Sequence, residues 1–93
     1  MKFEWDENKN IKNVEKQGLN FKDAKDLFTN GTMYVIIDNR KNYGEVRYSG
    51  LGYINKRLVN VVFTTRPSGV VRIISFRKAN DREKKRFEYS SQN

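Results

Sequence analysis

The chain has 93 residues, with 19 Lys and Arg against 11 Asp and Glu, which gives a formal net charge of +8. We expect a single domain over residues 1–93, because this length suits one hydrophobic core and leaves no room for two. The sequence has no cysteine and no histidine. Their absence excludes disulfides, zinc sites of the Cys/His type, thiol catalysis and every mechanism that needs imidazole.

The sequence also bears on membranes and partners. No apolar run approaches the roughly 20 residues that span a bilayer, and the opening MKFEWDENKN lacks the apolar stretch of a signal peptide. We therefore expect a soluble, cytoplasmic protein without a membrane partner. The excess of positive charge predicts a polyanionic partner. Nothing in the sequence calls for a cofactor.

The N-terminal residues predict a strand and then a helix. The opening KFEW alternates polar and apolar side chains, which is typical of a short strand. Asp6 suits the N-cap of a helix over residues 7 to 17, and Gly18 suits its C-terminal end. This helix carries a narrow apolar stripe formed by Ile11 and Val14.

A second helix is predicted to begin at the cap residue Asn20 and to stop at Asn30-Gly31. One face of it is apolar, so we expect it to pack on the rest of the molecule. That face consists of Phe21, Ala24, Leu27 and Phe28.

The following residues read as strands joined by short turns. Apolar or alternating patterns predict strands over 33–37, 45–54, 57–65 and 70–78. Residues 38–44 form a polar loop and Asn55-Lys56 a tight turn. The two glycines in the second of these strands indicate a bulge or a close backbone approach. In strand 70–78 neither face is cleanly polar, so the pattern leaves open which side chains point inward.

Asn80 and Glu83 form the capping signal of a last helix, over roughly residues 81 to 90. The expected fold class is therefore α+β. Two N-terminal helices pack on a three- to four-stranded antiparallel sheet, and a C-terminal helix follows. The other face of such a sheet can stay partly open.

The positive charge is concentrated in the second half of the chain. Residues 1–45 hold eight basic and eight acidic side chains, whereas residues 46–93 hold eleven and three. Such a one-sided distribution is typical of a phosphate-binding face, although a solvated surface is the plainer alternative. The densest part consists of Arg66, Arg72, Arg77, Lys78, Arg82, Lys84, Lys85 and Arg86.

Two parts of this region predict contacts with RNA. Arg77 and Lys78 end a strand beside the start of the last helix, where strand-end cations and free amides favour a phosphate site. The alternative is that they only pair with Glu83 or Glu45. The last helix carries a basic stripe ending in an aromatic ring, which suits RNA or an acidic protein. The stripe consists of Arg82, Lys85, Arg86 and Tyr89.

Glu45 and Arg47 share a strand face, two residues apart. A carboxylate beside a guanidinium can act as an acid or base with a transition-state stabiliser, but it is more often a surface ion pair. A nuclease built from these residues would have no clustered carboxylates of the two-metal type. Such a nuclease would therefore cleave RNA without a metal ion, by attack of the 2′-OH on the neighbouring phosphate.

Three blocks of the sequence, in this order, resemble the BrnT-type toxins of bacterial type II toxin–antitoxin systems. The blocks are FEWDENKNIKNVEKQGLNFKDAKDLF, YGEVRYSGLGYINKRLVNVVFTTR and VRIISFRKANDREKKRFEY. The segment RIISFRKA, followed by Glu83 and Tyr89, is the most specific part. One position departs from the family pattern, since Gln17 stands where the family commonly has histidine.

The resemblance implies a RelE-like fold and a ribonuclease that inhibits translation. It also implies a ribbon-helix-helix antitoxin of the BrnA type, which forms a toxin–antitoxin heterotetramer on an antitoxin dimer and binds operator DNA. Carried over residue by residue, the candidate catalytic groups are Arg77, Lys78, Arg72, Arg47, Tyr89 and Glu45. The basic surface adds Arg66, Arg82, Lys85 and Arg86 as RNA contacts.

Two other interpretations stay open at this point. The chain could be a non-catalytic module that binds RNA or an antitoxin, such as an inactive toxin relative. It could also serve only as a protein partner for an acidic or amphipathic segment. A non-catalytic module would bind RNA without cleaving it, so an RNA cleavage assay distinguishes it from an enzyme. A chain that only binds a protein segment would lose its RNA affinity at physiological salt, whereas a phosphate-binding site would lose affinity steeply but predictably as the salt concentration rises.

Overall fold

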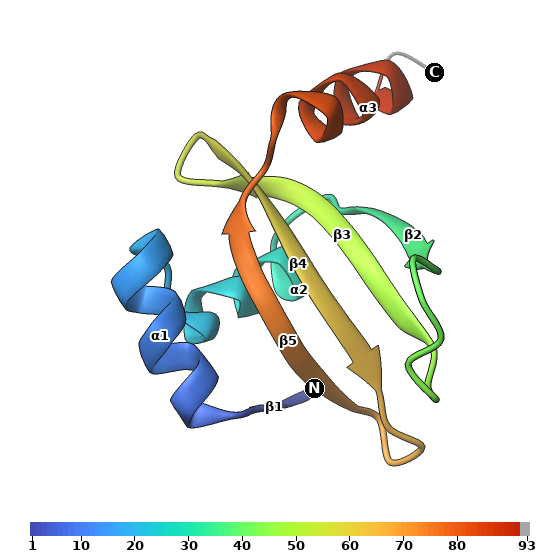
Figure 1. Ribbon diagram of the computed structural model, residues 1–93. Coiled ribbons are helices and arrows are strands. Elements are labelled where there is room, and N and C mark those ends of the chain that lie inside the picture. The colour runs from blue at the N-terminus through green and yellow to red at the C-terminus, as the bar shows by residue number, and fades with distance from the viewer. Residues whose placement is uncertain (92–93) are drawn as a thin grey trace.

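The computed structural model describes residues 1–91, and Figure 1 shows its helices and strands. Five strands form one sheet in the order β1-β5-β4-β3-β2. In chain order the elements are β1 (Lys2–Trp5), α1 (Glu7–Gln17), the 3-10 helix η1 (Phe21–Ala24), α2 (Lys25–Thr29), β2 (Tyr34–Asp38), β3 (Arg47–Ile54), β4 (Arg57–Thr65), β5 (Val70–Lys78) and α3 (Asp81–Ser91).

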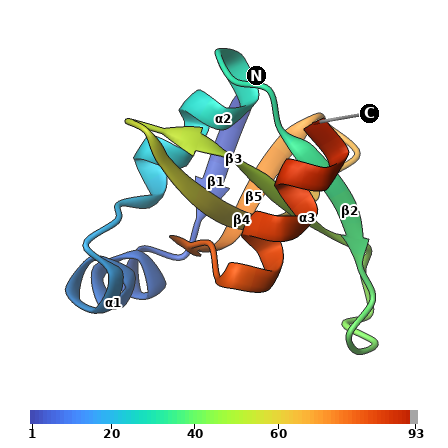
Figure 2. The ribbon, with the colours of Figure 1, turned by 90° about the horizontal axis from the view of Figure 1, so that it is seen from above.

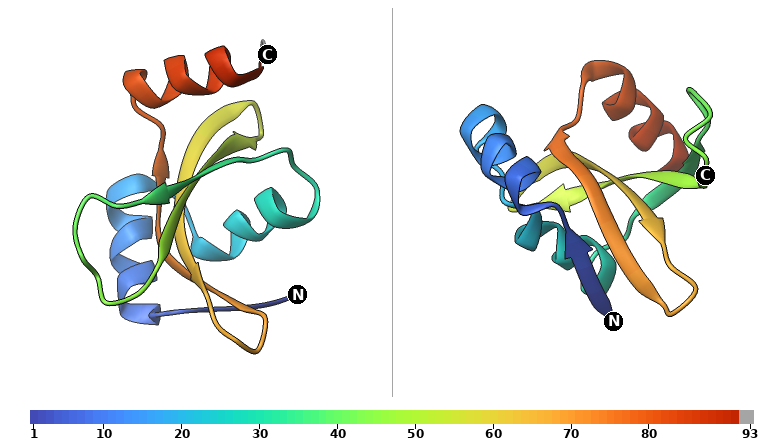
Figure 3. Two further views of the ribbon diagram at one scale, coloured as in Figure 1. Left: turned by 90° about the vertical axis from the view of Figure 1, so that its right-hand side faces the viewer. Right: turned by 60° about the horizontal axis from the view of Figure 1, so that its bottom comes forward.

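The α+β class is confirmed, but the expected three- to four-stranded antiparallel sheet is wrong. β2 to β5 form an antiparallel meander, and β1 adds a fifth strand that runs parallel to β5, with Lys2 opposite Val70. The right panel of Figure 3 shows β1 alongside β5. Short turns predict pairing only between strands that follow each other, so the local pattern carried no sign that the first strand joins the last.

α1 has the predicted bounds but a different contact with the sheet. The Asp6 carboxylate caps it by accepting from two backbone N–H groups, and Gly18 ends it with φ 69°. Ile11 and Val14 stay 51% and 41% exposed, so the predicted apolar stripe does not face the core. The helix is attached instead by Asn13, whose amide donates to the Phe76 carbonyl of β5 over 2.7 Å.

The second predicted helix is two short helices, η1 and α2, which cover one face of the sheet. They pass behind the strands in Figure 1. Close approach accounts for both glycines of β3, because a Cβ on Gly50 would lie 2.5 Å from the Met33 sulfur and one on Gly52 would lie 2.7 Å from the Leu27 side chain. No bulge occurs there. The core consists of Phe21, Ala24, Leu27, Val59, Val61, Phe63, Val71, Ile73 and Phe76.

We call the covered side of the sheet the helix face and the opposite side the open face. On β4, Val59 and Val61 belong to the helix face, so alternation places Asn60 and Val62 on the open face. Figure 2 shows α3 lying over the strands when the molecule is seen from above. In the residues that the structure describes, no helix is long and apolar enough to cross a membrane.

A β-bulge decides which side chains of β5 reach the open face. Ser75 lies opposite Val62 and Ile73 opposite Phe63, which leaves Ile74 without a partner on β4. The extra residue shifts the alternation by one position. Arg72 and Arg77 therefore share the open face, although they are five positions apart and a regular strand would place them on opposite sides.

Candidate active site

A pocket of about 300 Å³ lies on the open face, between the end of β5, the first turns of α3 and the end of β2. Four arginines and two acids line it, so its formal charge is +2. We call it the arginine pocket. The charged lining residues are Arg40, Arg77, Arg82, Arg86, Asp38 and Glu83.

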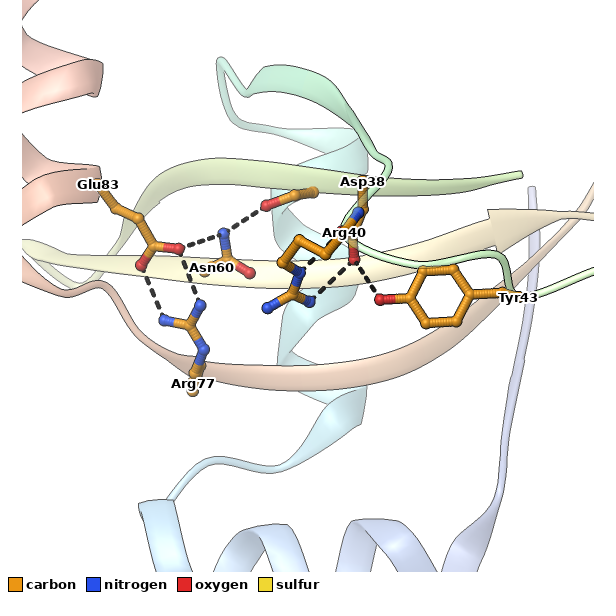
Figure 4. A network of polar contacts seen from close by, with 7 residues as sticks. Asp38, Arg40, Tyr43, Asn60, Arg77 and Glu83 are labelled. Atoms are coloured by element: carbon orange, nitrogen blue, oxygen red, sulfur yellow. Dashed lines mark hydrogen bonds and ion pairs between the residues drawn. The ribbon is translucent and has the colours of Figure 1, made fainter. Parts of the chain in front are cut away.

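Arg77 is held in the arginine pocket by a two-pronged ion pair. Both of its terminal nitrogens donate to Glu83 of α3, each over 2.8 Å (Figure 4). Asn80 fixes Glu83 in turn, because the two residues exchange side-chain to backbone hydrogen bonds of 2.8 and 3.0 Å. The predicted helix cap is thus confirmed. It also positions the carboxylate that orients Arg77.

Asn60 forms the floor of the arginine pocket beneath this ion pair. It is fully buried, and its amide nitrogen donates to Ser49 over 2.7 Å and to Glu83 over 3.2 Å. Its amide oxygen has no hydrogen-bond partner among the described residues. A buried side chain that donates twice restricts the position of Glu83, and through it the position of Arg77.

The electrostatics of the arginine pocket keep Glu83 ionised. Burial raises the pKa of its carboxyl, but hydrogen bonds from Arg77 and the Asn80 backbone, with the charges of Arg77 and Arg86, outweigh it and hold that pKa below its usual value. Since both oxygens accept from Arg77, this carboxylate is better suited to holding a cation than to removing a proton.

A second ion pair borders the arginine pocket at the end of β2. Arg40 donates to both oxygens of Asp38, over 2.8 and 2.9 Å, and the Tyr43 hydroxyl donates to the same carboxylate over 3.4 Å. Figure 4 shows this group beside the one around Glu83. The Arg40 hydrogen bond holds the pKa of the Asp38 carboxyl below its usual value against the opposing effect of burial.

The arrangement is suited to binding a phosphate. Guanidinium groups from β5, from α3 and from the loop after β2 surround one concave space. The planar fork of arginine matches two phosphate oxygens. The two acids do not cancel this charge, because each of them is paired with one arginine and two further arginines remain. A phosphodiester that gains negative charge during attack would be stabilised here.

Three of the predicted site residues meet in the arginine pocket, namely Arg77, Arg82 and Arg86. Arg72 and Arg66 lie at the other end of the sheet and pair with Glu4. Glu45 and Arg47 pair with each other over 3.1 Å, and the Arg47 guanidinium lies 4.0 Å from the centre of the Tyr43 ring. Lys78, Lys85 and Tyr89 are exposed and do not line this pocket.

Four residues that shape the arginine pocket were not predicted. Asp38 was assigned to a polar loop, but it ends β2 and is buried. Arg40 follows it in the chain. Asn60 interrupts the apolar run RLVNVVFTT, and a polar residue inside such a run was a usable signal of a buried hydrogen bond. Ser49 gave no such signal.

Among residues 1–91, no group of three or more His, Cys, Asp and Glu side chains is arranged to hold a metal ion. The one glutamate and the one aspartate of the arginine pocket, Glu83 and Asp38, are each paired with an arginine.

The family model of BrnT, described as the ribonuclease toxin of a type II toxin–antitoxin system, matches residues 5–83. The 1.1 Å crystal structure of the Brucella abortus ribonuclease toxin BrnT is similar, with 28% sequence identity and a TM-score of 0.65. The similarity covers 87% of this chain and 99% of that one. No match is found among curated protein sequences. Since the family model spans most of the chain, the chain belongs to the BrnT family of ribonuclease toxins of type II toxin–antitoxin systems.

Proposed function

We propose that this chain is a single-domain endoribonuclease toxin that cleaves RNA in the cytoplasm and thereby inhibits translation. The observation that carries the proposal is the convergence of four guanidinium groups on one pocket of the open face. Membership of the family implies an antitoxin partner and supports ribonuclease activity. In this proposal the scissile phosphate binds in the arginine pocket.

In the proposed reaction the 2′-oxygen of a ribose attacks the adjacent phosphorus and loses its proton. The bond to the 5′-oxygen of the next nucleotide breaks, and that oxygen takes up a proton. The products carry a 2′,3′-cyclic phosphate and a 5′-hydroxyl. Arg77, oriented by Glu83, and the neighbouring Arg82 and Arg86 stabilise the added negative charge on the phosphate. The arginines supply this charge without a metal ion.

Gln17 does not weigh against this site. It is the last residue of α1, and Gly18 beside it lines a separate pocket with Val59 and Phe76 on the helix face. The position where the family commonly has histidine is therefore on the other side of the sheet from the arginine pocket. A non-catalytic relative is the second candidate function, and cleavage tests it directly.

The antitoxin in our proposal is a ribbon-helix-helix protein of the BrnA type. We propose a heterotetramer built on an antitoxin dimer, which binds operator DNA through the antitoxin. In this proposal the antitoxin neutralises the toxin by covering the arginine pocket or its entrance. Arg77 and Lys78 should accordingly lose solvent exposure in the complex, and an interface confined to α1 and α2 would contradict this part of the proposal.

The test is induced expression in bacteria of the wild type, Arg77→Gln and a matched control, Arg57→Gln. Arg57 is an exposed arginine that lines the separate pocket on the helix face, so the control removes the same charge. We expect growth arrest and new RNA ends with the wild type and Arg57→Gln, and neither with Arg77→Gln. Normal growth with soluble, folded wild type would contradict the proposal.

The chemistry is tested with purified protein. Cleavage should leave 2′,3′-cyclic phosphate ends and should persist in EDTA, whereas an all-DNA substrate should stay intact. Because Arg77→Gln also frees a buried carboxylate, its thermal unfolding is measured beside that of Arg77→Lys, which keeps a positive charge. Loss of cleavage upon chelation would contradict the metal-independent mechanism.

A further inference from the structure

A second group of charges lies on the open face, at the end of the sheet away from α3. We call it the Glu4 cluster, and it consists of Glu4 of β1, Arg72 of β5 and Arg66 of the turn before β5. Arg72 contacts one oxygen of Glu4 over 2.6 Å, and Arg66 lies 3.5 Å from the other. Two guanidinium groups therefore share one carboxylate, which leaves one positive charge in excess.

This positive charge can be reached from solvent. The side chains of Arg66 and Arg72 are 43% and 32% exposed, and that of Glu4 is 39% exposed. At such exposure the ion pairs contribute about 1 kcal/mol or less to stability, because water screens them. An incoming anion could replace Glu4 at little cost. The cluster is better suited to exchange of partners than to holding the sheet together.

The Glu4 cluster and the arginine pocket lie on the same face because of the bulge in β5. Arg72 is opposite Thr64, and Arg77 is opposite Asn60. With one bulged residue between them, a rise of about 3.3 Å per residue places their backbones about 13–16 Å apart. This exceeds the spacing of neighbouring phosphates in a nucleic acid strand, so the two sites would contact phosphates that are not adjacent.

Between the two sites the strands themselves form the surface, with Val62 and Thr64 of β4 buried and Ser75 of β5 half-buried. The open-face residues there include Ser75 and Val62, which lie opposite each other on β5 and β4. In Figure 1, none of the helices within residues 1–91 passes in front of this part of the strands, and α3 lies above their upper end. The left panel of Figure 3 shows α3 at that same end. A chain bound at both sites would cross these strands without meeting a helix.

We propose that the Glu4 cluster is a distal phosphate subsite for single-stranded RNA whose reacting phosphate is in the arginine pocket. This rests on the proposed function. Two cationic sites on the same face of the sheet match a polymer with charge at regular intervals. In this proposal Arg72 and Arg66 bind substrate and take no part in the chemical step, and Glu4 competes with the RNA for both arginines.

The experiment measures binding of 2′-O-methyl RNA, which cannot be cleaved, as a dinucleotide and as a strand of about eight nucleotides. The wild type should bind the longer strand more tightly, and its affinity should fall more steeply with salt. Arg72→Gln should lower the affinity for the longer strand about fivefold and leave the affinity for the dinucleotide unchanged. One lost phosphate contact should reduce the slope of log K against log salt by about 0.7.

Glu4→Gln provides a test of opposite sign. It frees two arginines from their competitor, so it should tighten binding of the longer strand and steepen the salt slope. Arg57→Gln, which removes an exposed positive charge from the helix face, is the matched control and should change neither. If Arg72→Gln does not fold, Arg66→Gln in the exposed turn tests the same subsite.

Three results would overturn the inference. If Arg72→Gln lowered the affinity for the dinucleotide as much as that for the longer strand, Arg72 would contact the reacting phosphate. Unchanged affinity in both Arg72→Gln and Glu4→Gln would make the cluster a structural ion pair. Dependence on Arg72 for an acidic peptide but not for RNA would assign the cluster to a protein partner. Since the probe cannot be cleaved, an inactive protein would refute the proposed function without touching this result.

Discussion

The two faces of the sheet are built from the same strands but have opposite properties. On β4, Val59, Val61 and Phe63 point to the helix face and pack among apolar side chains. Asn60 lies between them on the open face and is hydrogen bonded to Glu83. Each residue of these strands thus serves one of two purposes, and neighbouring residues in the sequence serve different ones. Stability and chemistry are separated by the alternation of the strand.

The division is not complete, because two acids of the arginine pocket, Asp38 and Glu83, are buried like the core. Glu83 is 7% exposed and carries a charge, whereas the helix-face core contains no charged side chain. The helix face is stabilised by removing apolar surface from water, and the arginine pocket by satisfying a buried charge. Substitutions on the helix face should therefore lower stability by removing apolar packing, whereas substitutions at the ion pairs of the arginine pocket should lower it by leaving a buried charge unpaired.

The largest effect is expected from the helix face. Phe76 is fully buried in the core, so Phe76→Ala removes its packing and leaves a cavity. We expect a loss of about 3–5 kcal/mol in the free energy of unfolding, a large part of the stability of a domain this small. Urea unfolding followed by circular dichroism measures it. A loss below about 1 kcal/mol would mean that the core repacks and is not the main source of stability.

The next largest effect is expected at Glu83, one of the two buried acids. Glu83→Gln leaves the Arg77 guanidinium without its counter-charge and should cost about 3 kcal/mol near pH 7. The pKa of Glu83 is lower in the folded chain than its ordinary value of 4.5. Its contribution is therefore present above about pH 4.5 and is lost as the pH falls through the folded-state pKa.

Urea unfolding across a pH series checks this dependence. The difference in stability between wild type and Glu83→Gln should narrow as the solution is acidified. The Asp38 carboxyl, whose pKa is also lowered, is present in both proteins and cancels in the comparison. A difference that stays constant with pH would show that the Glu83 charge is not what stabilises the fold.

A smaller effect on activity, with none on stability, is expected at the solvent side of the arginine pocket. Arg86 lines the pocket from α3 and is half-buried. Arg86→Ala should reduce the rate of RNA cleavage about tenfold, which corresponds to about 1.4 kcal/mol. The free energy of unfolding should change by less than about 0.5 kcal/mol. Lys84→Ala, an exposed neighbour outside the pocket lining, is the control.

Local signals in the sequence predicted most of the elements. Asp6 and Asn80 cap helices through hydrogen bonds to residues two or three positions away, and Gly18 adopts a conformation that its own lack of a side chain permits. Strands 57–65 and 70–78 have the predicted bounds. These features depend on neighbours in the chain, which is why the sequence alone was enough.

Features that depend on distant residues were not predicted. The pairing of β1 with β5 joins the two ends of the chain. The bulge at Ile74 carries no glycine or other local mark, so the placement of Arg72 on the open face could not be deduced from the run VVRIISFRK. Arg77, Arg82 and Arg86 were predicted from the high density of basic residues in that part of the sequence. Asn60 and Asp38 are far from them in the chain, and only the pairing of the strands brings them close.

The smallest effect is expected at the hairpin between β3 and β4, which belongs to neither face. Asn55 and Lys56 both have positive φ, 50° and 66°, as a tight turn of this type requires. Positive φ is sterically unfavourable for lysine and less so for asparagine.

Lys56→Gly should therefore raise the free energy of unfolding by about 1 kcal/mol, and Asn55→Gly by less. Thermal unfolding of the two variants measures the difference. The turn fixes the register of β3 against β4, and with it the position of Ser49 opposite Val62 on the open face. If the two faces are independent, cleavage by Lys56→Gly should equal that of the wild type. A stabilised protein with slower cleavage would instead show that the arginine pocket depends on flexibility of the sheet beneath it.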